Sequence, residues 1–306
     1  MNMHDWALVI FTILAQMAVG SFVILGVVHF FVSRRSGIET ADKLSDRALL
    51  AIGPVLVLGA IATFFHLGNP VNAPRAFSNL GQSWLSWEIL LLVVFIVLGG
   101  VFAIMQWRKI STPSTRNIIA VVAALVGLAL VYVMAMVYML PTVPAWNTPI
   151  TVISFYTTTF LLGALAVGAA YAINYAYLRS KNQANDEQSK VLALALRWVA
   201  LTAVLMLGVQ FVIIPVYVAQ LATGGTAAVA SAEILLNQNT VLFGLRLALV
   251  FLGAGIFGLF LYRTATSADG RIQIMSSYVY AAFALALVAE VIGRYLFYTS
   301  FVRIGI

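Results

Sequence analysis

The sequence contains no cysteine and carries very little charge. Its 306 residues include 10 Asp and Glu and 17 Lys and Arg, so only 9% are charged, against roughly a quarter in an ordinary soluble domain. The lack of cysteine excludes disulfides, thiolate metal sites, iron–sulfur clusters and cysteine nucleophiles within this protein. Hydrophobic residues make up 62% of the sequence, more than a soluble core could bury. The sequence therefore predicts an integral membrane protein.

Eight apolar segments are long enough to cross a bilayer, which takes about 20 helical residues. Because backbone groups in lipid must be paired within their own segment, each segment is predicted to be an α-helix. The expected fold class is an all-α bundle of eight transmembrane helices, forming a single membrane domain over residues 1–306. The predicted helices lie near residues 6–32, 48–67, 84–107, 117–139, 150–178, 191–221, 240–262 and 274–301, and polar runs such as 33–46, 68–83 and 179–190 are expected to connect them.

The basic residues predict the orientation of the protein in the membrane. Thirteen of the 17 Lys and Arg residues fall in the connections after the first, third, fifth and seventh predicted helices, namely Arg34, Arg35, Lys43, Arg47, Arg108, Lys109, Arg116, Arg179, Lys181, Lys190, Arg197, Arg263 and Arg271. The positive-inside rule assigns these connections to the cytoplasm. An even number of crossings then places both termini outside. We expect a multi-pass protein of a prokaryotic plasma (inner) membrane in contact with lipid, and the net charge of +7 is not expected to serve nucleic-acid binding.

Ionisable residues within the predicted helices mark candidate functional positions. Placing such a residue at the centre of a bilayer costs about 2.5–3.5 kcal/mol on insertion scales, and its side chain normally faces a partner or a wet cavity. Five of them gather in the outer leaflet: His66, Glu88, Arg246, Glu290 and Arg294. This one-sided distribution indicates a polar site near the outer face.

Each of these residues also has a purely structural interpretation. Glu290 and Arg294 are spaced i, i+4 and can neutralise each other, while Arg246 can either complete that pair or reach the outer headgroups. His66 can cap the second helix, with Gly68 as the left-handed residue. Glu88 lies early in its helix and suits the positive end of the helix dipole. Both interpretations of these five positions stay open at this point.

Other polar residues of the helices favour structural roles. Gln16 and Gln210 are typical of interhelical hydrogen bonds, and His29 is expected to be a satisfied interhelical histidine. His29 and His66 are predicted in opposite leaflets, so a haem with two histidine ligands is not expected, although one histidine with another ligand such as methionine stays open. No carboxylate cluster for a divalent metal is present, and we expect no haem, iron–sulfur cluster or metal in this protein.

A histidine, a carboxylate and arginines at one membrane face, among aromatic residues, suit a quinone. The quinone head group needs hydrogen-bond donors and acceptors, its ring fits between aromatic or apolar walls, and its tail enters from lipid. Oxidising a quinol removes two electrons and two protons, so a base near its hydroxyls is required. His66 and Glu88 are the natural candidates for this base, and the aromatic residues nearby are Trp84, Trp87, Trp146, Tyr295, Phe297 and Tyr298.

Several short elements along the sequence together resemble a known family. They are Phe11-Thr12 with Gln16, His66-Leu67-Gly68 followed by Pro70 and Arg75-Ala76-Phe77, Ser86 with Glu88, Thr142-Val143-Pro144 with Trp146, and Glu290-Val291-Ile292-Gly293-Arg294 with Phe297-Tyr298. In this order they resemble the membrane-anchor subunits of dimethyl sulfoxide reductases, within the broader group of polysulfide-reductase-type anchors. The nine positions from His66 to Arg75 exceed the spacing associated with the family, as an insertion at residues 72–74 would produce.

The resemblance implies a function that composition alone does not. Such anchors bind menaquinol, hold an iron–sulfur subunit and a molybdopterin catalytic subunit at the membrane, and pass quinol electrons to the iron–sulfur subunit in anaerobic respiration. Carried over by position, His66 and Glu88 are implied to bind quinol and accept its protons. The remaining candidates, implied to shape the pocket or balance its charge, are Gln16, Arg75, Ser86, Arg246, Glu290 and Arg294. The protein would be the quinol-oxidising subunit of an oxidoreductase complex, without activity of its own toward the terminal acceptor.

Two other classes of function remain open from the sequence. A secondary transporter also places charges within helices, and broken helices at the membrane midplane and an inverted repeat would favour it. A purely structural anchor would use the same polar cluster for assembly alone and would not bind quinone analogues.

Overall fold

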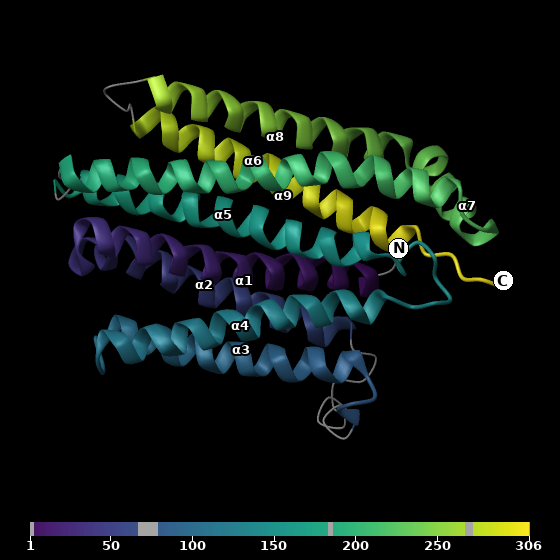
Figure 1. Cartoon of the computed structure of the whole chain (residues 1–306), viewed down its shortest axis with the longest axis horizontal. Coiled ribbons are helices and arrows are strands. Elements are labelled where there is room, and N and C mark those ends of the chain that lie inside the picture. The colour runs from purple at the N-terminus through teal and green to yellow at the C-terminus, as the bar shows by residue number, and fades with distance from the viewer. Residues whose placement is uncertain (1–2, 67–78, 183–185, 267–271, 306) are drawn as a thin grey trace.

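The computed structural model describes residues 3–66, 79–182, 186–266 and 272–305, and the regular elements within these ranges are all helices. The eight long helices lie side by side in one elongated bundle (Figure 1). They are α1 (Met3–Ser36), α2 (Ile38–His66), α3 (Trp84–Trp107), α4 (Pro113–Tyr138), α5 (Pro149–Ser180), α6 (Asp186–Ala222), α8 (Thr240–Thr266) and α9 (Ile272–Thr299). The short helix α7 (Thr226–Glu233) and the π-helical turn η2 (Ile234–Gln238) join α6 to α8.

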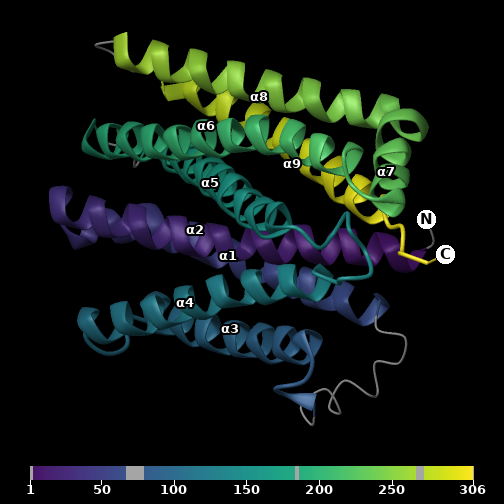
Figure 2. The same cartoon turned by 45° about the vertical axis from the view of Figure 1, so that its right-hand side comes forward.

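The described helices have the lengths and apolar character of membrane spans. Seven of them can cross a bilayer on their own, and the number rises to eight if α7, η2 and the start of α8, bent by 80° at their junction, count as one span. The prediction of an all-α membrane bundle is confirmed. Helix α1 begins and α9 ends at the same end of the bundle, as an even number of crossings requires (Figure 2).

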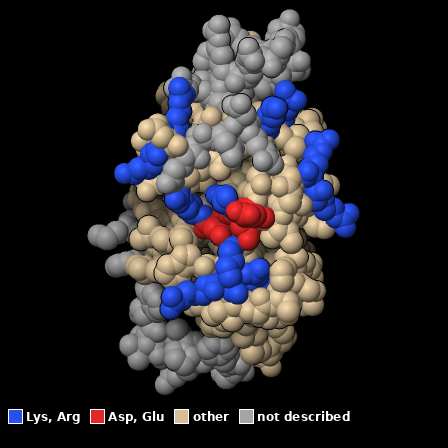
Figure 3. Space-filling model, turned by 90° about the vertical axis from the view of Figure 1, so that its left-hand side faces the viewer, with Lys and Arg blue, Asp and Glu red and all other residues tan. Residues whose placement is uncertain are grey.

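The two ends of the bundle differ in chemical character. We call the end where α1 begins and α9 ends the terminal end, and the opposite end the basic end. At the basic end, Lys and Arg side chains surround a compact group of acidic side chains (Figure 3). That the basic end faces the cytoplasm stays a prediction from the positive-inside rule.

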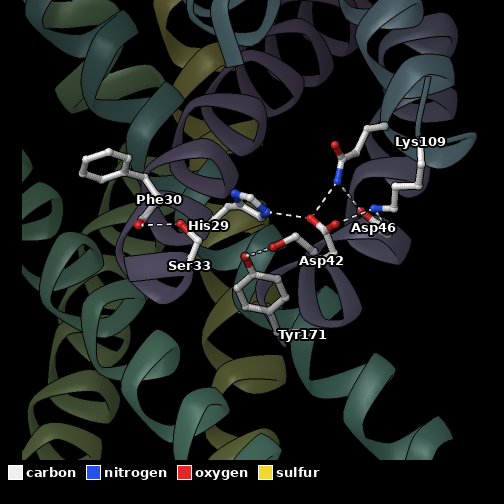
Figure 4. A network of polar contacts seen from close by, with 9 residues as sticks. His29, Phe30, Ser33, Asp42, Asp46, Lys109 and Tyr171 are labelled. Atoms are coloured by element: carbon white, nitrogen blue, oxygen red, sulfur yellow. Dashed lines mark hydrogen bonds and ion pairs between the residues drawn. The ribbon is translucent and has the colours of Figure 1, made fainter. Parts of the chain in front are cut away.

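A network of hydrogen bonds ties three helices together at the basic end (Figure 4). His29 of α1 lies 2.9 Å from Asp42 of α2, which also accepts hydrogen bonds from Gln106 of α3 at 2.8 Å and from Lys109 at 2.6 Å. Asp46 accepts a second pair of hydrogen bonds from Gln106 and Lys109. The expectation that His29 is a satisfied interhelical histidine is confirmed. Every charge in this network has an opposite neighbour, so the network serves packing.

The predicted connection at residues 33–46 was wrong in its extent. Helix α1 continues to Ser36 and α2 begins at Ile38, so Gly37 alone separates them. Gly37 has a φ of +83°, a conformation that glycine adopts without the steric cost of a side chain. The prediction equated the end of the apolar run with the end of the helix. A fall in hydropathy marks only the edge of the membrane, and a polar segment whose backbone and side chains find partners can continue as helix beyond it.

The stretch between α6 and α8 contains α7 and η2. Helix α7 begins after Gly225 in an alanine-rich run that favours helix. Eight residues are too few to cross a bilayer, so a search for spans passes over such a helix. Together α7 and η2 cover the terminal end beside α6 and α8 (Figure 1).

Helix α1 occupies the centre of the bundle. It packs along α2 and α5 and also contacts α4, α6 and α9. Its inward side chains, such as Phe11, Ile13 and Val19, are almost completely buried. Polar groups on α1 therefore meet partners from several helices, and this central position makes α1 one wall of the site described next.

Candidate functional site

Helix α9 carries a line of buried polar side chains in the half of the bundle near the terminal end. Glu290, Arg294 and Tyr298 are spaced four residues apart and so share one helix face. Their exposed fractions are 3%, 3% and 9%. Groups of this polarity are costly to bury in a membrane unless each finds a partner, and their partners come from four other helices.

Glu290 is held by neutral donors rather than by an arginine. Thr158 of α5 donates a hydrogen bond of 2.6 Å to one carboxylate oxygen, and the amide of Gln210 of α6 donates to the other. Within the described part of the protein, no ion pair within 4.0 Å joins Glu290 to Arg294 or Arg246. The i, i+4 spacing on α9 thus does not produce the direct ion pair that the sequence allowed. The expected interhelical role of Gln210 is confirmed.

Arg294 connects the last described helix to the first. Its Nη2 donates to Oε1 of Gln16 on α1 at 2.9 Å, and Gln16 is completely buried. The guanidinium carbon lies 3.9 Å from the ring centroid of Phe155 on α5, within the range of a cation–π interaction. Arg294 is therefore fixed on two sides, by an amide and by an aromatic face.

A pair of tyrosines extends this polar line toward α4. The hydroxyls of Tyr138 and Tyr298 lie 2.9 Å apart, and Tyr298 donates to Thr12 of α1 at 3.5 Å. Trp146 stacks on Phe297 with ring centroids 5.3 Å apart and packs edge-on against Tyr138. These rings form an aromatic wall at the terminal end. Sequence reasoning placed Trp146, Phe297 and Tyr298 near the site but missed Tyr138, which ends an otherwise apolar helix and gives no signal by itself.

Glu88 lies beside this wall in the first turns of α3. It is 5% exposed, and Ser86, two residues earlier, is 3% exposed. The charge of Glu88 acts on the hydroxyls of both Tyr138 and Tyr298. No hydrogen bond joins Glu88 to another of the residues that the structure describes. Among the described residues, Glu88 is therefore a buried carboxylate beside two tyrosine hydroxyls.

Two of the predicted site residues fall outside the part of the protein that the structure describes. Helix α2 ends at His66, but the side chain of His66 and the whole of Arg75 are not among the described groups. The predicted meeting of His66 with Glu88 therefore stays a prediction. Of the other candidates, the structure brings Gln16 and Arg294 into direct contact and sets Glu290 one turn away on α9.

A cavity of about 60 Å³ opens on the other flank of α9, between α5, α6, α8 and η2. Glu290, Arg294 and Arg246 all line it, and the further polar groups are Thr151, Ser154, Thr158 and Tyr217. Most of the remaining wall is apolar, formed by Ile150, Ile213, Ile214, Leu235, Phe243, Leu296 and Phe297.

Arg246 of α8 packs directly onto the backbone of α9. A Cβ atom at position 293 would lie 2.6 Å from Nε and 2.7 Å from Cζ of Arg246, so only glycine permits this approach. Nε of Arg246 is buried without a hydrogen-bond partner. Arg246 lines the cavity and interacts electrostatically with Glu290, although no ion pair within 4.0 Å joins the two among the described residues. Both structural interpretations of Arg246 stay predictions.

The fold and this interior define a class: a multi-pass helical membrane protein with a buried polar site near one end of its bundle. Comparison of its sequence with known protein families identifies the family within this class. The protein belongs to the family of DMSO reductase anchor subunits (DmsC), which matches residues 1–299. It is thus a membrane anchor subunit of a molybdoenzyme complex, located in the bacterial inner membrane. The predicted family is confirmed.

Individual relatives agree with this assignment. The protein is 28% identical to the C subunit of the anaerobic dimethyl sulfoxide reductase of Haemophilus influenzae, over 97% of its own length and 95% of that subunit. It is 27% identical to the subunit of the same name from Escherichia coli, over 99% and 96% of the two lengths. Among solved structures, bd oxidase from Geobacillus thermodenitrificans matches with a TM-score of 0.64 at 14% identity, covering 97% of this protein and 85% of the matched polypeptide. That likeness shows the fold alone.

Proposed function

We propose that this anchor oxidises menaquinol near the terminal end of the bundle and passes the electrons to an iron–sulfur partner subunit. From there they would reach a molybdopterin catalytic subunit that reduces the terminal acceptor. The relatives named for dimethyl sulfoxide reductase support the assignment to a respiratory complex. The protein would act as the quinol-oxidising part of an oxidoreductase and have no activity toward the terminal acceptor by itself.

The proposal depends on one observation: the burial of the Glu88 carboxylate and its lack of a hydrogen-bond donor among the described residues. A carboxylate that is 5% exposed in a membrane helix is expensive to keep, and no described residue donates a hydrogen bond to it. Structural carboxylates avoid that cost, as Glu290 does with Thr158 and Gln210. A buried carboxylate to which no described residue donates suits a group that meets a substrate hydroxyl and takes its proton.

The surroundings of Glu88 suit an aromatic substrate head. Trp146 and Phe297 form a stacked wall, and the Tyr138–Tyr298 pair offers hydroxyls that both donate and accept hydrogen bonds. An aromatic ring packs well against such a wall in offset or edge-on geometry. The polar head of a quinol would thus find apolar faces for its ring and oxygen partners for its hydroxyls.

The proposed oxidation accounts for both protons and both electrons of the quinol. Both O–H bonds of the quinol break, and two protons pass to Glu88 and, as the family resemblance implies, to His66. Two electrons leave for the iron–sulfur subunit, and the product is the quinone. Proton release at the terminal end would then deliver both protons to the non-cytoplasmic side, if the positive-inside orientation holds.

Replacing Glu88 tests the proposal. In the assembled complex, Glu88→Gln and His66→Ala should reduce menaquinol-linked turnover by roughly 100-fold or more, the scale at which a positioned acid or base contributes. Electron transfer from a soluble reduced dye, which bypasses the anchor, should stay at the wild-type rate. Glu39→Gln is a matched control, because Glu39 lies at the opposite end with its side chain 83% exposed and should leave both activities unchanged.

The two assays separate the possible functions. Wild-type menaquinol turnover in Glu88→Gln, in a complex that assembles normally, would remove Glu88 from the site. Loss of dye-linked turnover together with menaquinol turnover would instead assign Glu88 to assembly, as expected for a purely structural anchor.

A further inference from the structure

The cavity lined by Arg246 lies apart from the surroundings of Glu88. Its walls come from α5, α6, η2, α8 and α9, whereas Glu88 belongs to α3. Helices α3 and α8 lie on opposite sides of the bundle in both views (Figures 1 and 2). Phe297 borders both places, whereas Arg246 and Glu290 line the cavity and Glu88 does not.

The cavity has a charge that its own residues leave unbalanced. Two guanidinium groups, Arg246 and Arg294, line it together with one carboxylate, Glu290. Arg294 is already occupied by Gln16 and Phe155. Nε of Arg246 is buried without a hydrogen-bond partner. A buried donor on a cation is costly to leave unpaired in a membrane, so the arrangement favours a ligand that accepts a hydrogen bond.

Arg246 and Glu290 line the same cavity and can both face one bound ligand. The two groups act on each other electrostatically, yet no ion pair within 4.0 Å joins them among the described residues. Thr158 and Gln210 each donate one hydrogen bond to the carboxylate of Glu290, and a carboxylate has about four acceptor positions. Glu290 can therefore accept a further hydrogen bond from a ligand that in turn accepts one from Arg246.

This pairing selects a hydroxyl over other polar heads. A hydroxyl both accepts and donates, which matches Arg246 on one side and Glu290 on the other. A phosphate diester only accepts, and its negative charge would be repelled by Glu290. The apolar part of the wall, which includes Phe243 and Phe297, suits a hydrocarbon ring behind the hydroxyl.

We propose that the cavity between α5, α6, α8 and α9 is a second binding site for a quinol, with one ring hydroxyl held between Arg246 and Glu290. The volume of about 60 Å³ is less than the roughly 150 Å³ that encloses a benzene ring. The cavity thus takes the hydroxyl-bearing edge of the ring, and the rest of the molecule lies outside it. The choice of quinol as ligand rests on the proposed function, but the polar groups that would hold it here, Arg246 and Glu290, are not those proposed to accept protons, Glu88 and His66.

Gly293 gives the site a test that leaves every polar group in place. Gly293→Ala would set a methyl group within 2.6–2.9 Å of the guanidinium atoms of Arg246 and force that side chain to move. Gly244→Ala is the matched control, because Gly244 lies on α8 close to Arg246 and a Cβ there meets nothing within 4 Å. Arg246→Gln removes the charge directly.

The experiment is a binding titration of the full-length protein in lipid nanodiscs with menadiol, a naphthoquinol without a tail, kept reduced under anaerobic conditions. We expect the wild type and Gly244→Ala to bind two menadiol molecules per protein. Gly293→Ala and Arg246→Gln should each weaken one of the two sites by about 10- to 100-fold, the scale of one hydrogen bond to a charged group. Glu88→Gln should weaken the other site alone.

The outcomes distinguish the two proposals. Two unchanged sites in both Gly293→Ala and Arg246→Gln would overturn the cavity site, as would a single wild-type site that is lost only in Glu88→Gln; in the second case the proposed function stands. A single site that is lost in Gly293→Ala and Arg246→Gln but kept in Glu88→Gln would support the cavity and remove Glu88 from quinol binding. Absence of any menadiol binding to the wild type would overturn both.

Discussion

Gly20 of α1 and Gly163 of α5 face each other where the two helices cross. A Cβ atom on Gly20 would lie 1.8 Å from the carbonyl oxygen of Thr159, and one on Gly163 would lie 2.2 Å from the carbonyl carbon of Gly20. Small residues permit such close approach of helix backbones in membranes. This crossing fixes α5, which carries Phe155 and Thr158, against the central helix α1 and so sets the width of the polar site.

Alanine at either glycine should therefore destabilise the bundle. We expect Gly20→Ala and Gly163→Ala each to lower the free energy of unfolding by roughly 1–3 kcal/mol or more, as overpacking does, because the helices must separate. Thermal unfolding of the purified protein in detergent measures the effect. Gly26→Ala on the same helix meets nothing within 4 Å and should leave stability equal or slightly higher. Equal melting temperatures for all three variants would contradict the close crossing.

The contacts of Arg294 need its planar guanidinium as well as its charge. Lysine keeps the charge but cannot stack on Phe155 while donating in the same plane to Gln16. We expect Arg294→Lys to cost about 2 kcal/mol, the scale of a desolvated cation–π contact. Arg34, whose guanidinium lies 4.4 Å from the ring of Phe30, is the control, and Arg34→Lys should cost less than about 1 kcal/mol.

A double-mutant cycle isolates the hydrogen bond between Arg294 and Gln16. Gln16→Leu, Arg294→Lys and the double variant should show a favourable coupling of at least about 0.5 kcal/mol, as residues in direct contact do. Strictly additive losses would mean that the two side chains act independently.

The tyrosine pair should matter for quinol turnover more than for stability. Tyr298→Phe removes the hydroxyl that lies 2.9 Å from Tyr138. If the proposed site is correct, menaquinol-linked turnover should fall by up to about tenfold, the value of one neutral hydrogen bond, and dye-linked turnover should not change. Tyr156→Phe removes a hydroxyl that donates to the carbonyl of Leu128 elsewhere on α4 and should leave both activities at the wild-type rate.

Lys109 should make the stability of the basic end depend on pH. Partial burial alone would lower its pKa, but hydrogen bonds and charges from Asp42 and Asp46 outweigh burial and raise the pKa of Lys109 above its ordinary value. A raised folded-state pKa gives stability that is present below the unfolded value, about 10.4, and is lost as the pH rises through the folded value.

Melting temperatures of the wild type and Lys109→Met test this dependence. The wild type should melt at the higher temperature near pH 8, and the difference should shrink as the pH rises above about 10.4. Glu39→Gln is the control, because Glu39 pairs only with the exposed Lys43 and a surface pair contributes little. A difference between wild type and Lys109→Met that stays constant with pH would exclude the proposed contribution of the lysine charge.

The sequence predicted the membrane bundle and most helix centres because hydropathy reports directly on burial in lipid. Glu88, Glu290 and Arg294 were singled out by their cost within a helix, and all three are buried in the bundle. Their partners could not be predicted, because Thr158 and Gln210 meet Glu290 only through the packing of three helices.

Two further features depend on geometry that spacing does not reveal. The i, i+4 relation of Glu290 and Arg294 suggested mutual pairing, yet each side chain is hydrogen-bonded to a residue of another helix. Gly293 stood out in the sequence only as part of a family motif, whereas its physical role is to admit Arg246 against its backbone. In both cases the deciding contact comes from a different helix.

The polar line on α9 also bears on how the protein is made. Because α9 is translated after the other described helices, Gln16 of α1 and Thr158 of α5 are already synthesised before Arg294 and Glu290 exist to receive them. A polypeptide that ended before α9 would leave the amide of Gln16 and the hydroxyl of Thr158 without these partners inside the membrane, where an unmatched polar group is costly, so the last helix completes the interior of the bundle.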